Sequence, residues 1–166
     1  ETVELEVRLG NITGGAFTTD VGKDAWHRLL KRLKKSLPFE HTNCREYRRG
    51  AHRLCVYDDG RRELVRKQRV SVRDAALPAD EGRLHYDVRA CVSTELLISN
   101  DDGAGMTQRK ARHKSRHSFR HKDYRFDLTR VDGSETAEYQ VEIELVRLDK
   151  GTDLGYVARK MACLAD

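Results

Sequence analysis

Two segments of the sequence each carry a pair of glutamates in an alternating pattern. Successive side chains of a strand point to opposite faces, so Glu4 and Glu6 share one face, and Glu142 and Glu144 share another. Valine, leucine and isoleucine occupy the alternate positions. Two carboxylates about 4 Å apart repel by about 4 kcal/mol at an effective dielectric of about 20, so a cation is expected between them. Carboxylate oxygens suit Mg²⁺ or Mn²⁺, and paired glutamates from two strands could hold one such metal ion.

On other predicted strands, basic and further polar side chains occupy alternate positions, so they share one face of their strand. Taken one strand at a time, such a face is typical of a strand with one side in solvent. Acids on two strands and bases on two others instead favour a barrel with a charged interior, in which the bases face an anion. A metal, a positive clamp and an oriented water would together suit phosphoryl transfer. The shared faces hold Lys114 with Arg116, Lys67 with Arg69, Asp127 with Thr129, and Arg89 with Ser93 and Glu95.

The hydrophobic patterns predict the elements that must position these side chains. A helix is expected at residues 20–37, where Asp20 would cap the start and Pro38 would end it, and a shorter helix at 152–165. The rest of the chain alternates with period two between turn signals. The expected fold is therefore mainly β (α+β), an eight-stranded antiparallel β-barrel with two or so flanking helices. The predicted strands are residues 2–9, 41–48, 52–58, 62–71, 86–97, 111–121, 123–132 and 137–148.

The composition bounds the class of protein. The chain has 166 residues, 36% of them charged and 38% apolar, which fits one globular domain over residues 1–166. Its net charge of +5 suits a polyanion such as RNA, and equally an ordinary soluble surface. The four cysteines have no zinc-ligand spacing and are expected to be reduced thiols of an intracellular protein. No apolar run is long enough to span a membrane. The first motif lies so close to Glu1 that a preceding segment is expected in the natural protein.

Two further groups of residues receive a structural interpretation. His113, His117 and His121 recur every four residues, but on a strand His113 and His117 point away from the basic pair and are expected at the surface. Cys55 and Cys91 could face the interior by the same alternation, where a small thiol is commonly a filler. No phosphate-binding loop and no HExxH motif is present.

The motifs, in their order along the chain, resemble those of the metal-dependent RNA 5′-triphosphatases of mRNA capping. These enzymes occur in fungi, protozoa and some DNA viruses and belong to the triphosphate tunnel metalloenzymes; the sequence looks most like a protozoan, trypanosomatid-like member. The resemblance spans nearly the whole chain. It rests on the glutamate motifs at residues 3–10 and 139–145, the basic motif at 112–116, the Asp-x-Thr motif at 127–131, and a further strand motif at 93–95.

The resemblance implies an eight-stranded tunnel and a role for each motif residue. Glu4, Glu6 and Glu144 would bind Mg²⁺ or Mn²⁺, and Glu142 would orient or activate the attacking water. The resemblance also implies that Lys114 and Arg116 clamp the γ-phosphate, with Arg53 and Lys67 as further clamps. Asp127 would orient clamp residues or a metal-bound water with Thr129 in support, Glu95 would brace a basic neighbour, and Gln140 stands where the family often has a third glutamate. From their shared strand faces, Arg69 and Arg89 are added as supporting residues.

The expected activity is removal of the γ-phosphate from triphosphate-ended pre-mRNA, which leaves a diphosphate end for capping. Hydrolysis of nucleoside triphosphates with Mn²⁺, a nuclear location and an RNA guanylyltransferase partner are implied with it. Two alternatives stay open. One is an inorganic tripolyphosphatase of the same fold, whose branch tends to open with Glu-x-Glu-x-Lys where this chain has Arg8. The other is a non-catalytic barrel that binds RNA through its basic residues.

Overall fold

The computed structural model describes residues 1–76, 86–98, 103, 105–108, 110–133 and 135–146. Within these residues the chain forms nine strands, one α-helix and a short 3₁₀ helix. The strands are β1 (Thr2–Thr13), β2 (Ala16–Thr18), β3 (Phe39–Arg49), β4 (His52–Tyr57), β5 (Arg62–Ala75), β6 (Asp87–Leu97), β7 (Arg112–His121), β8 (Tyr124–Asp132) and β9 (Glu138–Leu145), and the helices are α1 (Lys23–Ser36) and η1 (Met106–Gln108).

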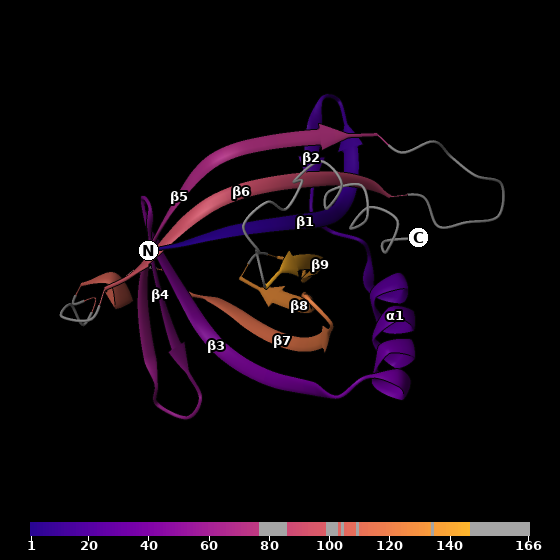
Figure 1. The fold of residues 1–166 in the computed structure, drawn as a ribbon. Coiled ribbons are helices and arrows are strands. Elements are labelled where there is room, and N and C mark those ends of the chain that lie inside the picture. The colour runs from indigo at the N-terminus through magenta and orange to yellow at the C-terminus, as the bar shows by residue number, and fades with distance from the viewer. Residues whose placement is uncertain (77–85, 99–102, 104, 109, 134, 147–166) are drawn as a thin grey trace, which may run out of the picture.

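Eight of the strands close into an antiparallel barrel (Figure 1). The order around the wall is β1-β6-β5-β4-β3-β7-β8-β9, and pairing of β1 with β9 closes the ring. Consecutive strands β3-β4-β5-β6 and β7-β8-β9 are neighbours, as expected for short antiparallel connections. The predicted eight-stranded antiparallel barrel is therefore confirmed.

The predicted strands all occur, but the ninth strand was not foreseen. β1 runs on past residue 9 and turns through Gly14 and Gly15, whose φ angles of 59° and 79° suit the turn of a two-residue hairpin. β2 is only three residues long and pairs with the end of β1. At Gly10, a Cβ would lie 1.9 Å from the carbonyl oxygen of Thr18, so the close approach of β2 requires glycine there.

The main hydrophobic core lies on the outer face of the barrel. Helix α1 packs its apolar side there, and Trp26 is 4% exposed. The core includes the apolar alternate positions of the glutamate strands, which places the glutamates on the inner face. Its buried members are Leu5, Val7, Leu9, Val21, Trp26, Val88, Phe119, Leu128, Val141, Ile143 and Leu145.

Helix α1 starts later than predicted, and Asp20 is not its cap. The helix begins at Lys23 after Gly22, whose φ is 80°. Asp20 Oδ1 instead accepts hydrogen bonds from the backbone N–H groups of Gly22 and Tyr139, both at 3.0 Å. Asp20 therefore fastens the approach to the helix onto β9. The predicted helix at 152–165 lies outside the described residues. No helix within the described part of the chain is long and apolar enough to cross a membrane.

His117 points away from the interior, but it is covered rather than placed at the surface as predicted. Its ring stacks on that of His41 at 4.3 Å between centroids and meets Trp26 edge-on at 6.0 Å. Burial, with the nearby charge of Lys34 and the His41 ring, lowers the pKa of His117 to about 4. Helix α1 contributes to this cover, because its Trp26 contacts the His117 ring and its Lys34 lies near enough to affect the pKa.

This environment makes stability depend on acidity. The unfolded chain takes up a proton at His117 near pH 6.5, whereas the folded chain does so near pH 4. The contribution of this neutral imidazole to stability is complete above pH 6.5 and is lost as the pH falls to 4. Urea unfolding of His117→Gln between pH 7 and 4 should therefore show a shallower loss of stability than the wild type. The exposed His113→Gln is the control, and an identical slope in both variants would contradict the assignment.

Candidate active site

The barrel encloses a cavity of about 690 Å³ whose wall is charged. Of the described residues, ten acidic and ten basic side chains line it, so this part of the wall is formally close to neutral although the chain as a whole is basic. The acidic residues are Glu4, Glu6, Glu40, Glu46, Glu63, Glu95, Asp127, Glu138, Glu142 and Glu144, and the basic residues are Arg8, Arg48, Arg53, Arg61, Lys67, Arg112, Lys114, Arg116, Arg120 and Arg125.

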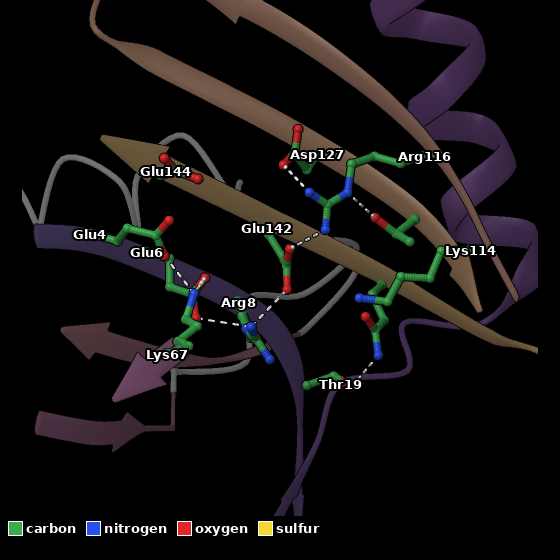
Figure 2. Close-up of polar contacts among 12 residues, drawn as sticks. Glu4, Glu6, Arg8, Thr19, Lys67, Lys114, Arg116, Asp127, Glu142 and Glu144 are labelled. Atoms are coloured by element: carbon green, nitrogen blue, oxygen red, sulfur yellow. Dashed lines mark hydrogen bonds and ion pairs between the residues drawn. The ribbon is translucent and has the colours of Figure 1, made fainter. Parts of the chain in front are cut away.

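Carboxylates gather where β1 pairs with β9. Glu6 and Glu144 are register partners across the closing pair of strands, and Glu4 lies two residues before Glu6 on the same face (Figure 2). Burial raises the pKa of Glu144 to about 7; the guanidinium of Arg125 opposes this rise, and the charges of Glu4, Asp127 and Glu6 add to it. Burial likewise raises the pKa of Glu4. Positive charge therefore does not fully compensate these carboxylates.

Lys67, predicted as a phosphate clamp, lies among these carboxylates. Its Nζ is 2.5 Å from Glu4 Oε2 and 3.0 Å from Glu95 Oε1. Glu6 Oε2 is 3.8 Å away. Burial opposes the charge on Lys67, but the three carboxylates outweigh it and raise the lysine's pKa. The basic neighbour of Glu95 is thus Lys67, and this ammonium supplies local charge balance.

Glu142 lies between two arginines. Its Oε1 is 3.0 Å from Arg8 Nη2, and its Oε2 is 3.6 Å from Arg116 Nη2 (Figure 2). Burial alone would raise the pKa of Glu142, but Arg8, Arg116 and Lys114 lower it to about 2. Arg8 also contacts Glu6 Oε1 at 2.9 Å, which links the glutamates of the two strands. Glu142 is therefore ionised throughout the neutral range.

Arg116, predicted as a phosphate clamp, is held in place by two neighbours on β8. Its Nε donates to Thr129 Oγ1 at 3.1 Å, and its Nη1 lies 3.3 Å from Asp127 Oδ2. Asp127 also accepts from Arg125 Nε at 3.1 Å, and Arg125 in turn pairs with Glu144. Asp127 and Thr129 are 2% and 1% exposed, so they act as a fixed support for the guanidinium.

Lys114 pairs with Glu46, a residue that the sequence reasoning did not identify. Lys114 Nζ donates to Glu46 Oε2 at 2.6 Å, and Arg48 Nε donates to Glu46 Oε1 at 2.7 Å. Arg112 Nη1 lies 3.7 Å from Glu46 Oε1. Burial opposes ionisation of Glu46, but Lys114 and Arg48 lower its pKa to about 2. The alternation within residues 41–48 already placed Glu46 on the same face as the cavity-lining Thr42 and Cys44.

The remaining predicted residues divide between the cavity and its outside. Arg53 lines the cavity, and burial followed by the charge of Arg48 lowers its pKa. Gln140 also lines it and donates to Thr19 Oγ1 at 3.2 Å. Arg89 instead pairs with Asp74 at 2.7 Å outside the cavity lining.

Arg69 is exposed and also lies outside the cavity lining. A β-bulge interrupts the pairing of β5 with β6 between Arg69 and Ser71. The bulge comes after Arg69, so Lys67 and Arg69 stay in one register with β6, yet only Lys67 of the two lines the cavity. Arg8, Glu46 and Arg125 are the additional residues that the structure brings to the predicted site.

The residues present suit a hard divalent cation, although they do not form a ready-made site. Among the described residues, no three His, Cys, Asp or Glu side chains are arranged so that they could hold a metal ion together. The donor chemistry nevertheless fits, because Glu4, Glu6 and Glu144 supply carboxylate oxygens from two paired strands. The raised pKa values of Glu144 and Glu4 are those of carboxylates that lack sufficient cationic charge.

The buried pair of Glu46 and Lys114 should be a major determinant of stability. Removal of one partner leaves an uncompensated charge, so Glu46→Ala should lower the free energy of unfolding by about 3–5 kcal/mol. The double variant Glu46→Leu with Lys114→Met should recover most of this loss, as measured by urea unfolding. Glu63→Ala removes a more exposed cavity carboxylate and should cost about 1 kcal/mol or less. Equal losses for Glu46→Ala and Glu63→Ala would contradict this description.

Comparison with solved structures places the fold. The chain is similar to the structure of S. pombe Pct1 RNA triphosphatase, with a TM-score of 0.69 and 22% identity over 89% of this chain and 72% of that one. The structure of the same S. pombe protein in complex with the Spt5 CTD matches with a TM-score of 0.70, 22% identity and the same coverage. At this identity the likeness establishes a shared fold.

Comparison of the sequence itself gives the family. No curated protein matches the chain significantly. The family model described as mRNA capping enzyme, beta chain, matches residues 30–160, which is more than half of the sequence. The match extends from helix α1 past the last barrel strand and includes both Lys114 and Arg116 on β7 and the glutamates on β9. The chain therefore belongs to the mRNA capping enzyme beta-chain family.

Proposed function

We propose that this protein is a metal-dependent RNA 5′-triphosphatase that hydrolyses the γ-phosphate of triphosphate-ended RNA. The family and the shared fold support this function at the level of mRNA capping. The observation that carries the proposal is the position of Glu142. It is a buried, ionised carboxylate between Arg8 and Arg116, next to further carboxylates on β1.

Basic residues of the cavity wall would bind the triphosphate. Lys114 and Arg116 both line the cavity, and their N–H groups can donate to γ-phosphate oxygens. Arg116 is already oriented by Thr129 and Asp127, so little side-chain entropy is lost when it binds the substrate. Arg53 lines the same cavity and would contact the phosphates as a further donor.

Glu142 would orient the attacking water. The water donates a hydrogen bond to the carboxylate and attacks the γ-phosphorus in line as the bond to the bridging β-phosphate oxygen breaks. A carboxylate whose pKa is about 2 is a weak base, so its main contribution is position rather than early proton removal. Phosphoryl transfer through a loose transition state needs little more than position and charge stabilisation. The proton of the water ends on the phosphate product.

The divalent ion would be held by Glu4, Glu6 and Glu144. When bound, Mg²⁺ or Mn²⁺ would neutralise charge that develops on the phosphate oxygens. Lys67, with Glu95 as its brace, and Arg125 hold positive charge beside these carboxylates in the structure. Gln140 brings an uncharged amide to the cavity wall, so the three proposed ligands would carry at most three negative charges in total.

The proposed function also bears on the domain organisation, a second substrate, a partner and the cellular location. We propose that residues 1–166 form a single catalytic domain of the protozoan type, which also hydrolyses nucleoside triphosphates with Mn²⁺. Its RNA product, with a diphosphate end, is the kind of substrate that an RNA guanylyltransferase consumes, so the protein would work in the nucleus beside such a partner.

Metal-dependent phosphate release is the direct test of this proposal. Wild-type protein with Mg²⁺ or Mn²⁺ should release phosphate from γ-labelled triphosphate RNA, and a chelator should stop the release. Glu144→Ala should reduce turnover by about 1,000-fold or more without unfolding, because it removes a ligand of the ion that stabilises the transition state. Tripolyphosphate cleavage without RNA cleavage would indicate the tripolyphosphatase of the same fold. RNA binding that survives loss of the glutamates, without phosphate release, would indicate a binding barrel.

If Arg116 clamps the γ-phosphate, kcat should be sensitive to a substitution of Arg116 even when the charge is kept. Arg116→Lys keeps the charge but loses the forked donor geometry, so kcat for triphosphate RNA should fall by about 100- to 1,000-fold. Arg32→Lys on the exposed side of α1 is the matched control and should leave kcat unchanged. Circular dichroism would establish that both variants fold. An unchanged kcat in Arg116→Lys would remove this residue from the clamp.

A further inference from the structure

Two cysteines lie side by side in the cavity wall, next to the basic clamp. Cys44 on β3 and Cys55 on β4 both line the cavity and are half-buried. The register pairs Cys44 with Tyr57 and Glu46 with Cys55, so the cysteines are diagonal neighbours on the inner face. Diagonal neighbours on one face of an antiparallel pair lie within reach of each other's side chains. The two thiols are therefore close together in a wall that faces the cavity.

The charges around this pair make its two members unequal. Cys44 lies directly opposite Lys114 on β7, and Arg116 is paired with the neighbouring inward position Thr42. The neighbouring Cys55 thiol lowers the pKa of Cys44 to about 7, with burial opposing this shift and Lys114 and Arg116 assisting it. The interaction with Cys44 and burial raise the pKa of Cys55. Cys44 therefore has more thiolate character than an ordinary cysteine, and Cys55 stays a thiol.

We propose that Cys44 and Cys55 form a peroxide-reactive dithiol site in the tunnel wall, and that its oxidation to a disulfide lowers the turnover of triphosphate RNA. The effect on turnover rests on the proposed function, whereas the oxidation does not. The site takes hydrogen peroxide or a small alkyl hydroperoxide. Reactive thiols of this kind have thiolate character, access to solvent and a second thiol within reach.

The chemistry balances in two steps. The Cys44 thiolate attacks one oxygen of the peroxide, the O–O bond breaks, and the hydroxide that leaves takes up a proton to become water. Cys44 is then a sulfenic acid, oxidised by two electrons. The Cys55 sulfur, after losing its proton, attacks the Cys44 sulfur; the S–S bond forms, the S–O bond breaks, and a second water leaves. In sum, two thiols and one peroxide give one disulfide and two waters.

The position of the pair explains why its oxidation would affect turnover. A disulfide draws the two sulfurs to about 2 Å from each other, well inside their van der Waals contact. The displaced segment of β3 also carries Glu46, which holds Lys114. Misplacement of a catalytic group by about 1 Å can cost about 100-fold in rate, so a loss of about tenfold or more is expected.

The remaining described cysteine provides an internal control. Cys91 on β6 is 5% exposed, does not line the cavity, and has its pKa raised by burial and by the charge of Glu6. A buried thiol whose pKa is raised should react slowly with peroxide. The structure therefore predicts selective oxidation at one pair rather than general oxidation of all thiols.

The test uses the full 166-residue chain treated with hydrogen peroxide, followed by alkylation and peptide mass mapping. The expected result is a disulfide between Cys44 and Cys55, a loss of phosphate release of about tenfold or more, and recovery of both thiols and activity with dithiothreitol. In Cys55→Ser, dimedone should trap a sulfenic acid at Cys44. In Cys44→Ser no disulfide should form at Cys55, and Cys91→Ser should behave as the wild type.

Each contrary result has a defined meaning. Peroxide that leaves Cys44 and Cys55 as free thiols, or that joins either one mainly to another cysteine, would overturn the dithiol site. A disulfide between them that leaves phosphate release unchanged would overturn its effect on turnover. If the untreated protein releases no phosphate, the proposed function fails, while the mass mapping still decides whether the dithiol site exists.

Discussion

Charge compensation inside the barrel is the constraint on which the rest of this structure depends. Ten acidic and ten basic side chains of the described residues share one cavity wall, and the buried ones among them would carry a large desolvation cost if left alone. Each strand must therefore arrive in the register that sets a carboxylate beside an ammonium or guanidinium. The link from Glu6 through Arg8 to Glu142 joins the first and last strands of the ring by this means. The apolar side chains, displaced outward, then form the core beneath helix α1.

The same constraint separates two kinds of carboxylate within one wall. Bases around Glu142 and Glu46 hold their pKa values at about 2 against burial, whereas burial, with the nearby acids, raises the pKa of Glu144 to about 7. The two classes differ by their neighbours, since all three side chains are largely withdrawn from solvent. A permanently ionised group suits the orientation of a water, and an undercompensated group suits a cation. The proposed division of labour between Glu142 and Glu144 follows from this difference.

Much of the fold could be predicted from the sequence, because the alternation of charged and apolar residues is a clear sign of a strand. The alternation around Glu4 and Glu144 gave the strands and their inner faces, but a three-residue strand such as β2 is too short to produce a pattern. Asp20 satisfied the usual rule for a helix cap, yet its oxygen serves a backbone group on β9, a tertiary contact that no local pattern contains. Lys67 shows the limit at the site: alternation fixed its face, whereas only the register with β6 shows that Glu95 and Glu4 surround it. The bulge after Arg69 likewise resets the alternation without any sequence signal that we can identify.

The closure of β1 onto β9 has a consequence for the shape of anything that reaches the inner wall. Every barrel strand has hydrogen-bonded neighbours on both sides, so no seam exists through which a long molecule could slip sideways without breaking a ladder of backbone bonds. A polymer can pass through the barrel only by threading, and threading begins at a terminus. The barrel thus discriminates by molecular topology before any side chain makes a contact: a circular strand cannot be threaded through it, whereas a linear strand can enter end first.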